Sequence, residues 1–286
     1  MEFFSALLQH GFLQTAVLAS LLASIGCGVI GTYVFVKRIA LIAGGIAHSV
    51  LGGVGAAVYY QFDPLLGALI TAIIAAILIG LVRLYWKTQE DTLIAALWAI
   101  GMAVGILFIS KTPGYQGDLI HYLFGNILLV PDKSLWFMAV LDIILLAIVG
   151  LFHKKFLIVV FDEEFAYLRG VPVTFYYLLL LSLVAVSIVL LIQLVGLILV
   201  LALLTLPAAV ASHYVHSLGK IMLFATMLGI SLCISGLALS YEPDLPSGPA
   251  IVVLAGCLFI VSSIIVRIRQ NYLLKNSISV RGKSSG

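Results

Sequence analysis

Long apolar stretches with almost no charge dominate this chain, and they constrain its fold more than any other feature of the sequence. Of the 286 residues, 63% are hydrophobic and only 9% are charged, whereas soluble domains are about a quarter charged. A membrane-spanning helix needs about 20 consecutive apolar residues. We therefore expect an all-α, polytopic membrane protein. The composition excludes a soluble enzyme, a disordered chain and a nucleic-acid-binding protein.

Apolar runs of membrane-spanning length recur along the whole sequence. They fall at 12–36, 41–60, 65–85, 92–110, 134–152, 174–193, 195–211, 221–240 and 248–266. The stretch from 174 to 211 is almost continuous, since only Gln193 and Gly196 interrupt it. We therefore predict about eight to nine transmembrane helices in a single domain over residues 1–286, with a short polar tail at 271–286.

Lysine and arginine are unevenly distributed between alternate loops, and this bias predicts the orientation. Short loops rich in these residues stay cytoplasmic. With nine spans and a cytoplasmic C-terminus, 13 of the 15 lie inside and only Lys111 and Lys133 lie outside. This arrangement places Met1 outside. The predicted outer loops contain acidic residues that would attract a cation: Asp63, Asp118, Asp132, Glu242 and Asp244.

His48 lies deep in the apolar run LIAGGIAHSVLGGVGAAV. An ionisable side chain inside a membrane segment marks a functional site by default, and neutral imidazole is the commonest transition-metal ligand. Gly44, Gly52 and Gly55 share a helical stripe with His48. The favoured interpretation is that these glycines serve helix packing, and the stripe would also give His48 a narrow, side-chain-free groove that an ion could enter. The alternative for His48 is a hydrogen bond to a neighbouring helix.

Further candidates for metal ligands are Asp142, Asp118 and His121. Asp142 lies about two turns inside its apolar run, where an unpaired carboxylate would be expensive. It must face a partner, water or an ion, and an inter-helix hydrogen bond is the favoured interpretation. Asp118 and His121 are three residues apart and could offer an oxygen and a nitrogen ligand from one helical face. The competing interpretation places both in a solvated outer loop.

Residues 161–172, FDEEFAYLRGVP, mix acidic and apolar side chains between two apolar runs. This pattern predicts a short interfacial helix on the cytoplasmic side, ended by Gly170 and Pro172.

His213 and His216 lie three residues apart at the predicted cytoplasmic end of a span, close to Lys220. They could bind a metal ion that leaves the pore. The interleaved apolar residues Tyr214, Val215 and Leu218 instead favour an amphipathic surface helix that touches a partner.

The sequence lacks the motifs of an ATP-binding site, of a hydrolase active site and of a paired-cysteine metal site. The tail GKSSG resembles the end of a phosphate-binding loop, but Ser277 stands where that motif needs its first glycine. HExxH and GxSxG are absent, and the three cysteines form no CxxC pair. We therefore expect no enzymatic activity and no permanently bound cofactor. If transport here uses ATP, a second protein must hydrolyse it.

Several segments together resemble the permease subunits of bacterial ABC importers for zinc, manganese or iron. KRIALIAGGIAHSVLGGVG is similar to the family's basic pair and glycine-rich, histidine-bearing helix. VGLILVLALLTLPAAVAS and LSYEPDLPSGPAIVV resemble two later family segments, as do FDEEFAYLRGVP and HYLFGNIL. The resemblance covers about residues 30–265.

The resemblance implies a homodimer in the lipid of the bacterial plasma (inner) membrane, with the pore at the dimer interface. Two ATP-binding cassette ATPase subunits would lie underneath, and an extracytoplasmic metal-binding protein would deliver the ion. The segment 207–220 would be the main ATPase contact, with 161–172 nearby. The coupling residues implied there are Pro207, His213, Tyr214, His216, Leu218 and Lys220.

His48 matches the histidine that contacts metal in the family, but the aspartate usually found four residues earlier is Gly44 here. Either another acid, such as Asp142 or one near Asp244, replaces it, or the ion is handled with fewer oxygen ligands. The loss of an oxygen ligand favours zinc over manganese. Because a carrier must release its ion, we expect a transient contact at His48.

Two other functional classes compete with this interpretation. An ATP-independent secondary metal-ion carrier or channel would use its polar residues as an ion or proton relay. An intramembrane hydrolase would need a catalytic pair, and no such pair can be assembled from this sequence.

Overall fold

The computed structural model describes residues 6–7, 9–86, 90–112, 125, 127, 130–241, 243 and 245–283, with the backbone alone for 90, 132–133, 193–195, 198–199 and 273–283. The long elements in this part of the chain are all helices, and no strand occurs in it, so the all-α prediction is confirmed. The helices are α2 (Gly11–Lys37), α3 (Ala40–Tyr59), α4 (Pro64–Tyr85), α5 (Glu90–Ser110), α7 (Asp132–Phe161), α8 (Glu163–Leu168), α9 (Val173–Tyr214), α10 (Leu218–Tyr241) and α11 (Ser247–Lys283).

Eight stretches of helix in the described residues are long and apolar enough to cross a membrane, and a further apolar helix, Val200–Tyr214, is shorter. The first part of α9, Val173–Ile192, is one of the eight, and Val200–Tyr214 is its second part. The backbone between these two arms leaves the helical conformation at Gly196, with φ 74° and ψ 171°. That region of backbone space is essentially restricted to glycine.

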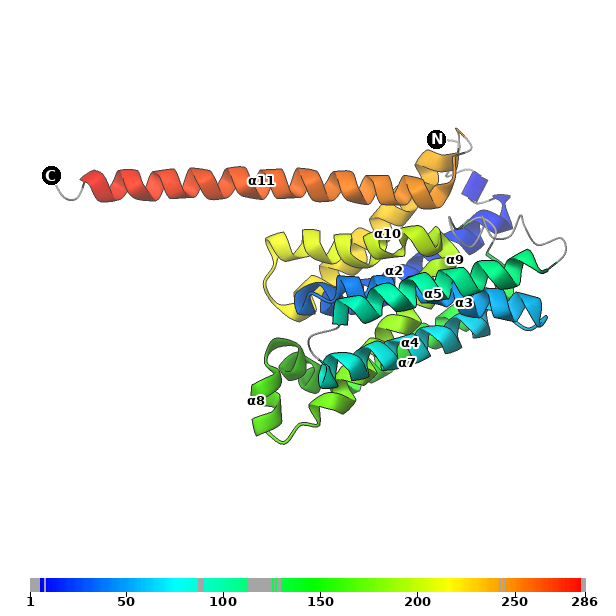
Figure 1. Ribbon diagram of the computed structural model, residues 1–286. Coiled ribbons are helices and arrows are strands. Elements are labelled where there is room, and N and C mark those ends of the chain that lie inside the picture. Colours follow the sequence, from blue (N-terminus) through cyan, green and yellow to red (C-terminus); the bar gives the residue numbers. More distant parts are fainter. Residues whose placement is uncertain are drawn as a thin grey trace.

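The two arms of α9 run in opposite directions (Figure 1). The first arm begins beside the C-terminal part of α7, where Tyr176 packs against Phe156. Further along this arm, Leu190 lies beside Gly26 of α2. In the second arm Leu204 lies against Gly31, which is nearer the C-terminal end of α2. The chain therefore turns back at Gly196, and both ends of α9 lie at the same end of the bundle.

Helix α2 lies at the centre of the packing, between α7, α9 and α10. A Cβ atom on Gly28 would collide with Thr226 of α10, and one on Gly31 with the carbonyl oxygen of Leu204. Small residues are common at such interfaces, because close contact rather than hydrophobic burial holds membrane helices together.

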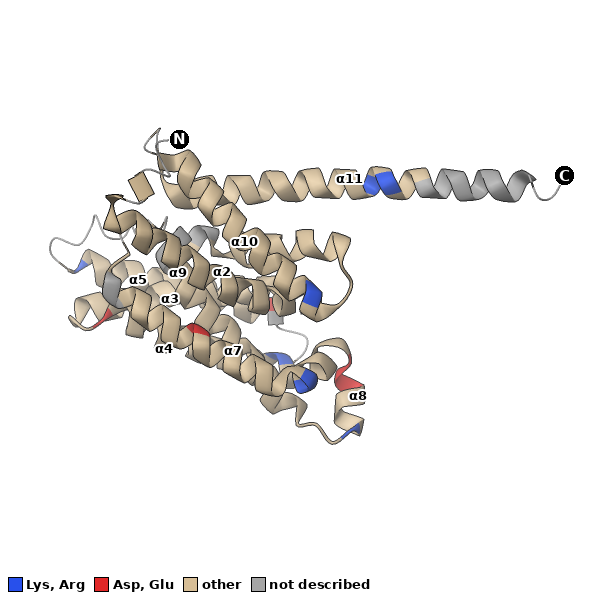
Figure 2. Ribbon diagram, turned by 180° about the vertical axis from the view of Figure 1, so that it is seen from behind, with Lys and Arg blue, Asp and Glu red and all other residues tan. Residues whose placement is uncertain are grey.

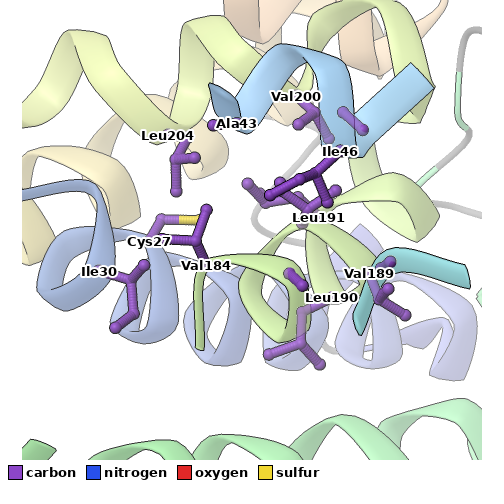
Figure 3. Packing of buried hydrophobic residues seen from close by; sticks show 14 of the residues in the cluster. Cys27, Ile30, Ala43, Ile46, Val184, Val189, Leu190, Leu191, Val200 and Leu204 are labelled. Carbon is purple, nitrogen blue, oxygen red and sulfur yellow. The ribbon is translucent and has the colours of Figure 1, made fainter. Parts of the chain in front are cut away.

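Buried side chains from α2, α3 and both arms of α9 fill the core (Figure 3). Cys27 of α2 lies close to Val184 in the first arm and Leu204 in the second, and Ile46 of α3 lies close to Leu191 and Val200 of the two arms. The reversal at Gly196 is therefore part of the core.

The two ends of the bundle differ in charge (Figure 2). Among the described side chains, lysine and arginine gather at the end that carries α8, and only Lys111 lies at the opposite end. They fall near the C-terminal ends of α2, α4 and α7, just after α8, near the start of α10, and on the stretch of α11 that extends past the bundle: Lys37, Arg38, Arg83, Lys154, Lys155, Arg169, Lys220, Arg267 and Arg269. This grouping agrees with the grouping predicted from the sequence.

The helix at residues 161–172 is confirmed as α8. Asp162 caps its first turn, since its carboxylate accepts a hydrogen bond of 2.9 Å from the backbone N–H of Phe165. The chain then leaves the helix through Gly170, whose φ of 71° suits a residue without a Cβ atom. Lys37 of α2 pairs with Glu163 at 2.6 Å and donates to the carbonyl oxygen of Val159 in α7. These contacts fix α8 to the end of the bundle.

Candidate functional site

Helix α3 places His48 at its contact with α5. The two backbones approach closely because glycines face each other across the contact. A Cβ atom on Gly52 would lie 3.1 Å from the carbonyl oxygen of Gly101, and one on Gly55 would lie 2.5 Å from that of Gly105. The helix packing predicted for Gly52 and Gly55 is therefore present, and the prediction of an open groove along this stripe is wrong, because the backbone of α5 fills the space beside these glycines.

The imidazole of His48 is 9% exposed and is held on two sides. Its Nδ1–H donates to the carbonyl oxygen of Gly44, one turn earlier in α3, at 2.9 Å. The ring also stacks on the indole of Trp98 from α5, with centroids 3.8 Å apart and an angle of 17° between the planes. Because a carbonyl oxygen can only accept, this tautomer leaves Nε2 with a free lone pair. Nε2 is thus the nitrogen available to a metal ion.

Gly44 leaves room for side chains from two other helices. A Cβ atom at this position would lie 3.0 Å from Cδ1 of Leu201 in the second arm of α9 and 3.4 Å from Cζ3 of Trp98. Those two side chains therefore occupy the space into which a larger residue at position 44 would extend.

Asp142 lies elsewhere in the bundle. It is 2% exposed in α7, and neither carboxylate oxygen has a hydrogen-bond partner among the described residues. Its Oδ1 lies 2.7 Å from the point where a Cβ atom of Gly26 would stand, with Leu190 alongside. Helix α7 packs mainly on α2, α8 and α9, whereas His48 faces α5. The structure thus does not bring Asp142 to His48, and the inter-helix hydrogen bond predicted for Asp142 is wrong.

The other predicted ligands, Asp118, His121 and Asp244, lie outside the described residues. Within the described part of the chain, no group of three or more His, Cys, Asp or Glu side chains could hold a metal ion. His48 therefore belongs to no such group in this part of the chain, and an ion beside it would need further ligands from water, the backbone or another molecule.

The predicted coupling segment 207–220 is not an amphipathic surface helix. It comprises the last turns of α9, the connection 215–217 and the start of α10. Leu218 is only 6% exposed, because it packs into the core, and Pro207 is buried as well. His216 and Lys220 are exposed. Only part of the segment can therefore meet a partner.

His213 and Tyr214 are engaged by α11. His213 Nδ1 lies 2.9 Å from Ser262 Oγ, which donates to the Tyr214 hydroxyl at 3.1 Å. His213 also stacks on Phe259, whereas His216 is exposed. The structure ties the end of α9 to α11 through His213.

Trp98 and Leu201 are the residues that sequence reasoning missed. Both lie in apolar runs where any large side chain suits a membrane helix. One signal was present: Ile94, Trp98, Gly101 and Gly105 recur at helical spacing, which marks one face of α5. The sequence does not show that this face meets α3.

Known proteins resemble this chain over most of its length. A model of the ABC 3 transport family matches residues 9–266. The chain is 41% identical over 277 residues to a probable metal transport system membrane protein of Chlamydia pneumoniae, covering 93% of this chain and 94% of that protein. It is 36% identical over 257 residues to the manganese transport system membrane protein MntC of Halalkalibacterium halodurans, covering 90% and 88%.

A solved structure has the same fold over nearly its whole length. The structure of PsaBC from Streptococcus pneumoniae in complex with Fab matches with a TM-score of 0.84 at 32% identity, covering 91% of this chain and 94% of that chain.

Proposed function

Because this chain belongs to the ABC 3 transport family, we propose that it is the membrane-spanning permease of an ATP-driven importer of a divalent transition-metal ion: zinc, manganese or iron. Relatives named for metal and manganese transport support this proposal, since they align with it over most of their length. The observation that carries it is His48, a buried imidazole in a membrane helix with one ring nitrogen bonded and the other free.

We infer that His48 contacts the ion transiently. A single imidazole binds a divalent ion weakly, because structural metal sites use about four protein ligands. Weak contact suits a transporter, which must release what it binds. The pore would form between two copies of the chain, and the second copy and water would complete the coordination of the ion.

We infer that the two ends of the bundle meet different partners. The basic end with α8 would face the cytoplasm and meet an ATP-binding cassette subunit through the exposed His216 and Lys220 and through α8. The opposite end would receive the ion from an extracytoplasmic metal-binding protein. The positive-inside rule supports this orientation.

Reconstitution tests the proposal. The chain, its ATP-binding cassette subunit and its metal-binding protein are placed in liposomes, and uptake of zinc, manganese and iron is measured with ATP and with a non-hydrolysable analogue. We expect uptake of at least one ion to require hydrolysis. Equal uptake under both conditions would identify a secondary carrier or channel instead.

His48→Ala tests the residue that carries the proposal. Uptake should be lost while the complex with the ATPase still forms, because the substitution removes the ligand and leaves the glycine contacts between α3 and α5. His10→Ala is the matched control, since His10 is exposed at the start of α2. Normal uptake by His48→Ala would make His48 a packing residue.

A further inference from the structure

Trp98 is the aromatic side chain of α5 that meets His48, and two glycines follow it on the same helical face. Ile94, Trp98, Gly101 and Gly105 follow one another along this face, opposite Gly45, His48, Ser49 and Leu51 of α3. A Cβ atom on Gly101 would come within 2.9 Å of the Ser49 carbonyl oxygen. The glycines C-terminal to Trp98 thus let the backbones of α3 and α5 approach closely. This close approach keeps the indole of Trp98 in contact with the imidazole of His48.

Trp98 restricts the rotation of the His48 ring that the hydrogen bond to Gly44 still allows. The bond from Nδ1–H to Gly44 fixes the tautomer, but the ring can still rock about that bond. An indole stacked on one face, with ring centroids 3.8 Å apart, blocks rotation toward that face. Leu201 reaches the same region from the second arm of α9, where it lies against Gly44 beside Trp98.

We propose that Trp98 is a positioning residue for metal transfer: it holds the His48 ring in the orientation that leaves Nε2 free for the ion. This inference rests on the proposed function of His48. Trp98 does not bind the metal ion itself. Its contribution is to hold the ligand in place before the ion arrives, so that the encounter costs less conformational entropy.

Transport kinetics give the first test. In the reconstituted complex, Trp98→Leu keeps an apolar side chain but removes the planar stack, whereas Trp98→Phe keeps a ring. We expect Trp98→Leu to raise the metal concentration at half-maximal uptake by about tenfold, the equivalent of about 1.4 kcal/mol, with a smaller change in maximal rate. Trp98→Phe should leave the metal concentration at half-maximal uptake close to that of wild type. Trp136→Leu is the matched control, because Trp136 is 76% exposed on α7, and it should behave as wild type.

Fluorescence gives a second test that needs neither metal nor ATP. In a Trp86→Phe, Trp136→Phe background, Trp98 is the only tryptophan that remains of the three in the chain. If the rings stack, His48→Ala should change the emission intensity of Trp98 in the purified full-length chain, and His10→Ala should not.

The two tests separate the possible failures. If the wild-type complex takes up no metal with ATP but the fluorescence changes as expected, the proposed function fails and the stacking stands. If the wild type transports and Trp98→Leu has wild-type kinetics, the positioning role is overturned. Equal losses for Trp98→Leu and Trp98→Phe in maximal rate alone would also overturn it, because a purely structural role would affect the amount of active protein.

Discussion

Glycine at position 44 leaves the space beside His48 open to side chains from other helices. With glycine at position 44, the backbone carbonyl accepts the histidine Nδ1–H, and Leu201 and Trp98 occupy the adjoining space. An acidic residue at position 44 would have to displace them. Residues from α3, α5 and α9 therefore form the site together. The effect of a substitution at position 44 depends on Trp98 and Leu201.

Gly44→Asp tests this interdependence. Alone it should reduce uptake of every ion, because its Cβ atom would meet Leu201 at 3.0 Å and crowding of this kind typically costs about 1–3 kcal/mol. Combined with Leu201→Ala, which makes room, the aspartate should supply an oxygen ligand on the face of His48 and raise manganese uptake relative to zinc. Zinc and manganese uptake by both variants is the measurement. If the single variant transports as well as the double, Leu201 does not restrict this space.

Asp142 and Gly26 form a second interdependent pair. The carboxylate lies where a side chain on Gly26 would stand, so Gly26→Ala should destabilise the protein by about 1–3 kcal/mol. In an Asp142→Ala background the same change should cost much less, because the new methyl group enters the vacated space. Thermal unfolding of the four proteins in detergent gives the coupling energy.

Gly150→Ala is the control for this cycle, since nothing lies within 4 Å of its Cβ position. It should leave the unfolding temperature close to that of wild type. Strictly additive effects of Gly26→Ala and Asp142→Ala would contradict the contact.

The candidate site was only partly predictable at this scale. The sequence singles out His48 and Asp142, because an ionisable side chain in an apolar run is conspicuous. It does not single out Trp98 or Leu201, since their importance arises from which helix faces meet. The unpartnered state of Asp142 is likewise a property of the packing of α7 on α2 and α9.

Among the elements, α9 departs most from expectation. The runs predicted at 174–193 and 195–211 are the two arms of one interrupted helix, and the second arm is shorter than the other spans. The chain turns back at Gly196 within an apolar stretch. In a membrane, non-helical backbone is tolerated where it is buried in protein, and Gly196 is buried. Hydropathy registers both arms as separate runs, and the reversal between them agrees with the nine-span count, but hydropathy does not show that α9 turns at a single glycine.

Gly196→Ala should disrupt this reversal. A φ of 74° with ψ of 171° is strained for any residue with a Cβ atom, at a cost of about 1–3 kcal/mol. The second arm places Leu201 beside Gly44, so we expect lower thermal stability together with lower uptake. Gly256→Ala in α11 is the control, because its Cβ position is open and its φ is not in the positive range. Wild-type stability and uptake in Gly196→Ala would show that the turn does not depend on glycine.

Helix ends show where periodicity and composition are informative. The runs at 12–36, 41–60 and 65–85 match α2, α3 and α4 to within one residue at each end, because charged or turn residues bound them closely. The run at 134–152 stops nine residues short of the end of α7 at Phe161. Lys154 and Lys155 interrupt its hydropathy but are exposed on a helix that continues.

For the whole molecule, the exposed part of the connection between α9 and α10 should determine assembly with the ATPase. Leu218 is unsuitable for testing this, because an acid at a position only 6% exposed would disturb the core. The combined change His216→Glu and Lys220→Glu acts on exposed positions, and it should weaken co-elution with the ATP-binding cassette subunit while the permease remains folded. Lys111→Glu, at the opposite end of the bundle, is the control. Unchanged co-elution of the double variant would place the contact elsewhere.

The charge asymmetry of the bundle predicts its orientation in the membrane. Nearly all described lysine and arginine residues lie at the end that carries α8 (Figure 2), so that end should be cytoplasmic. In a variant with the native cysteines replaced, a membrane-impermeant maleimide added to intact cells should label Phe62→Cys, between α3 and α4, and not Tyr167→Cys in α8. Both side chains are well exposed, so access depends only on the side of the membrane. Permeabilised cells should show labelling of both positions. The reverse pattern in intact cells would invert the molecule and place the proposed ATPase contact outside the cell, where no ATPase could act on it.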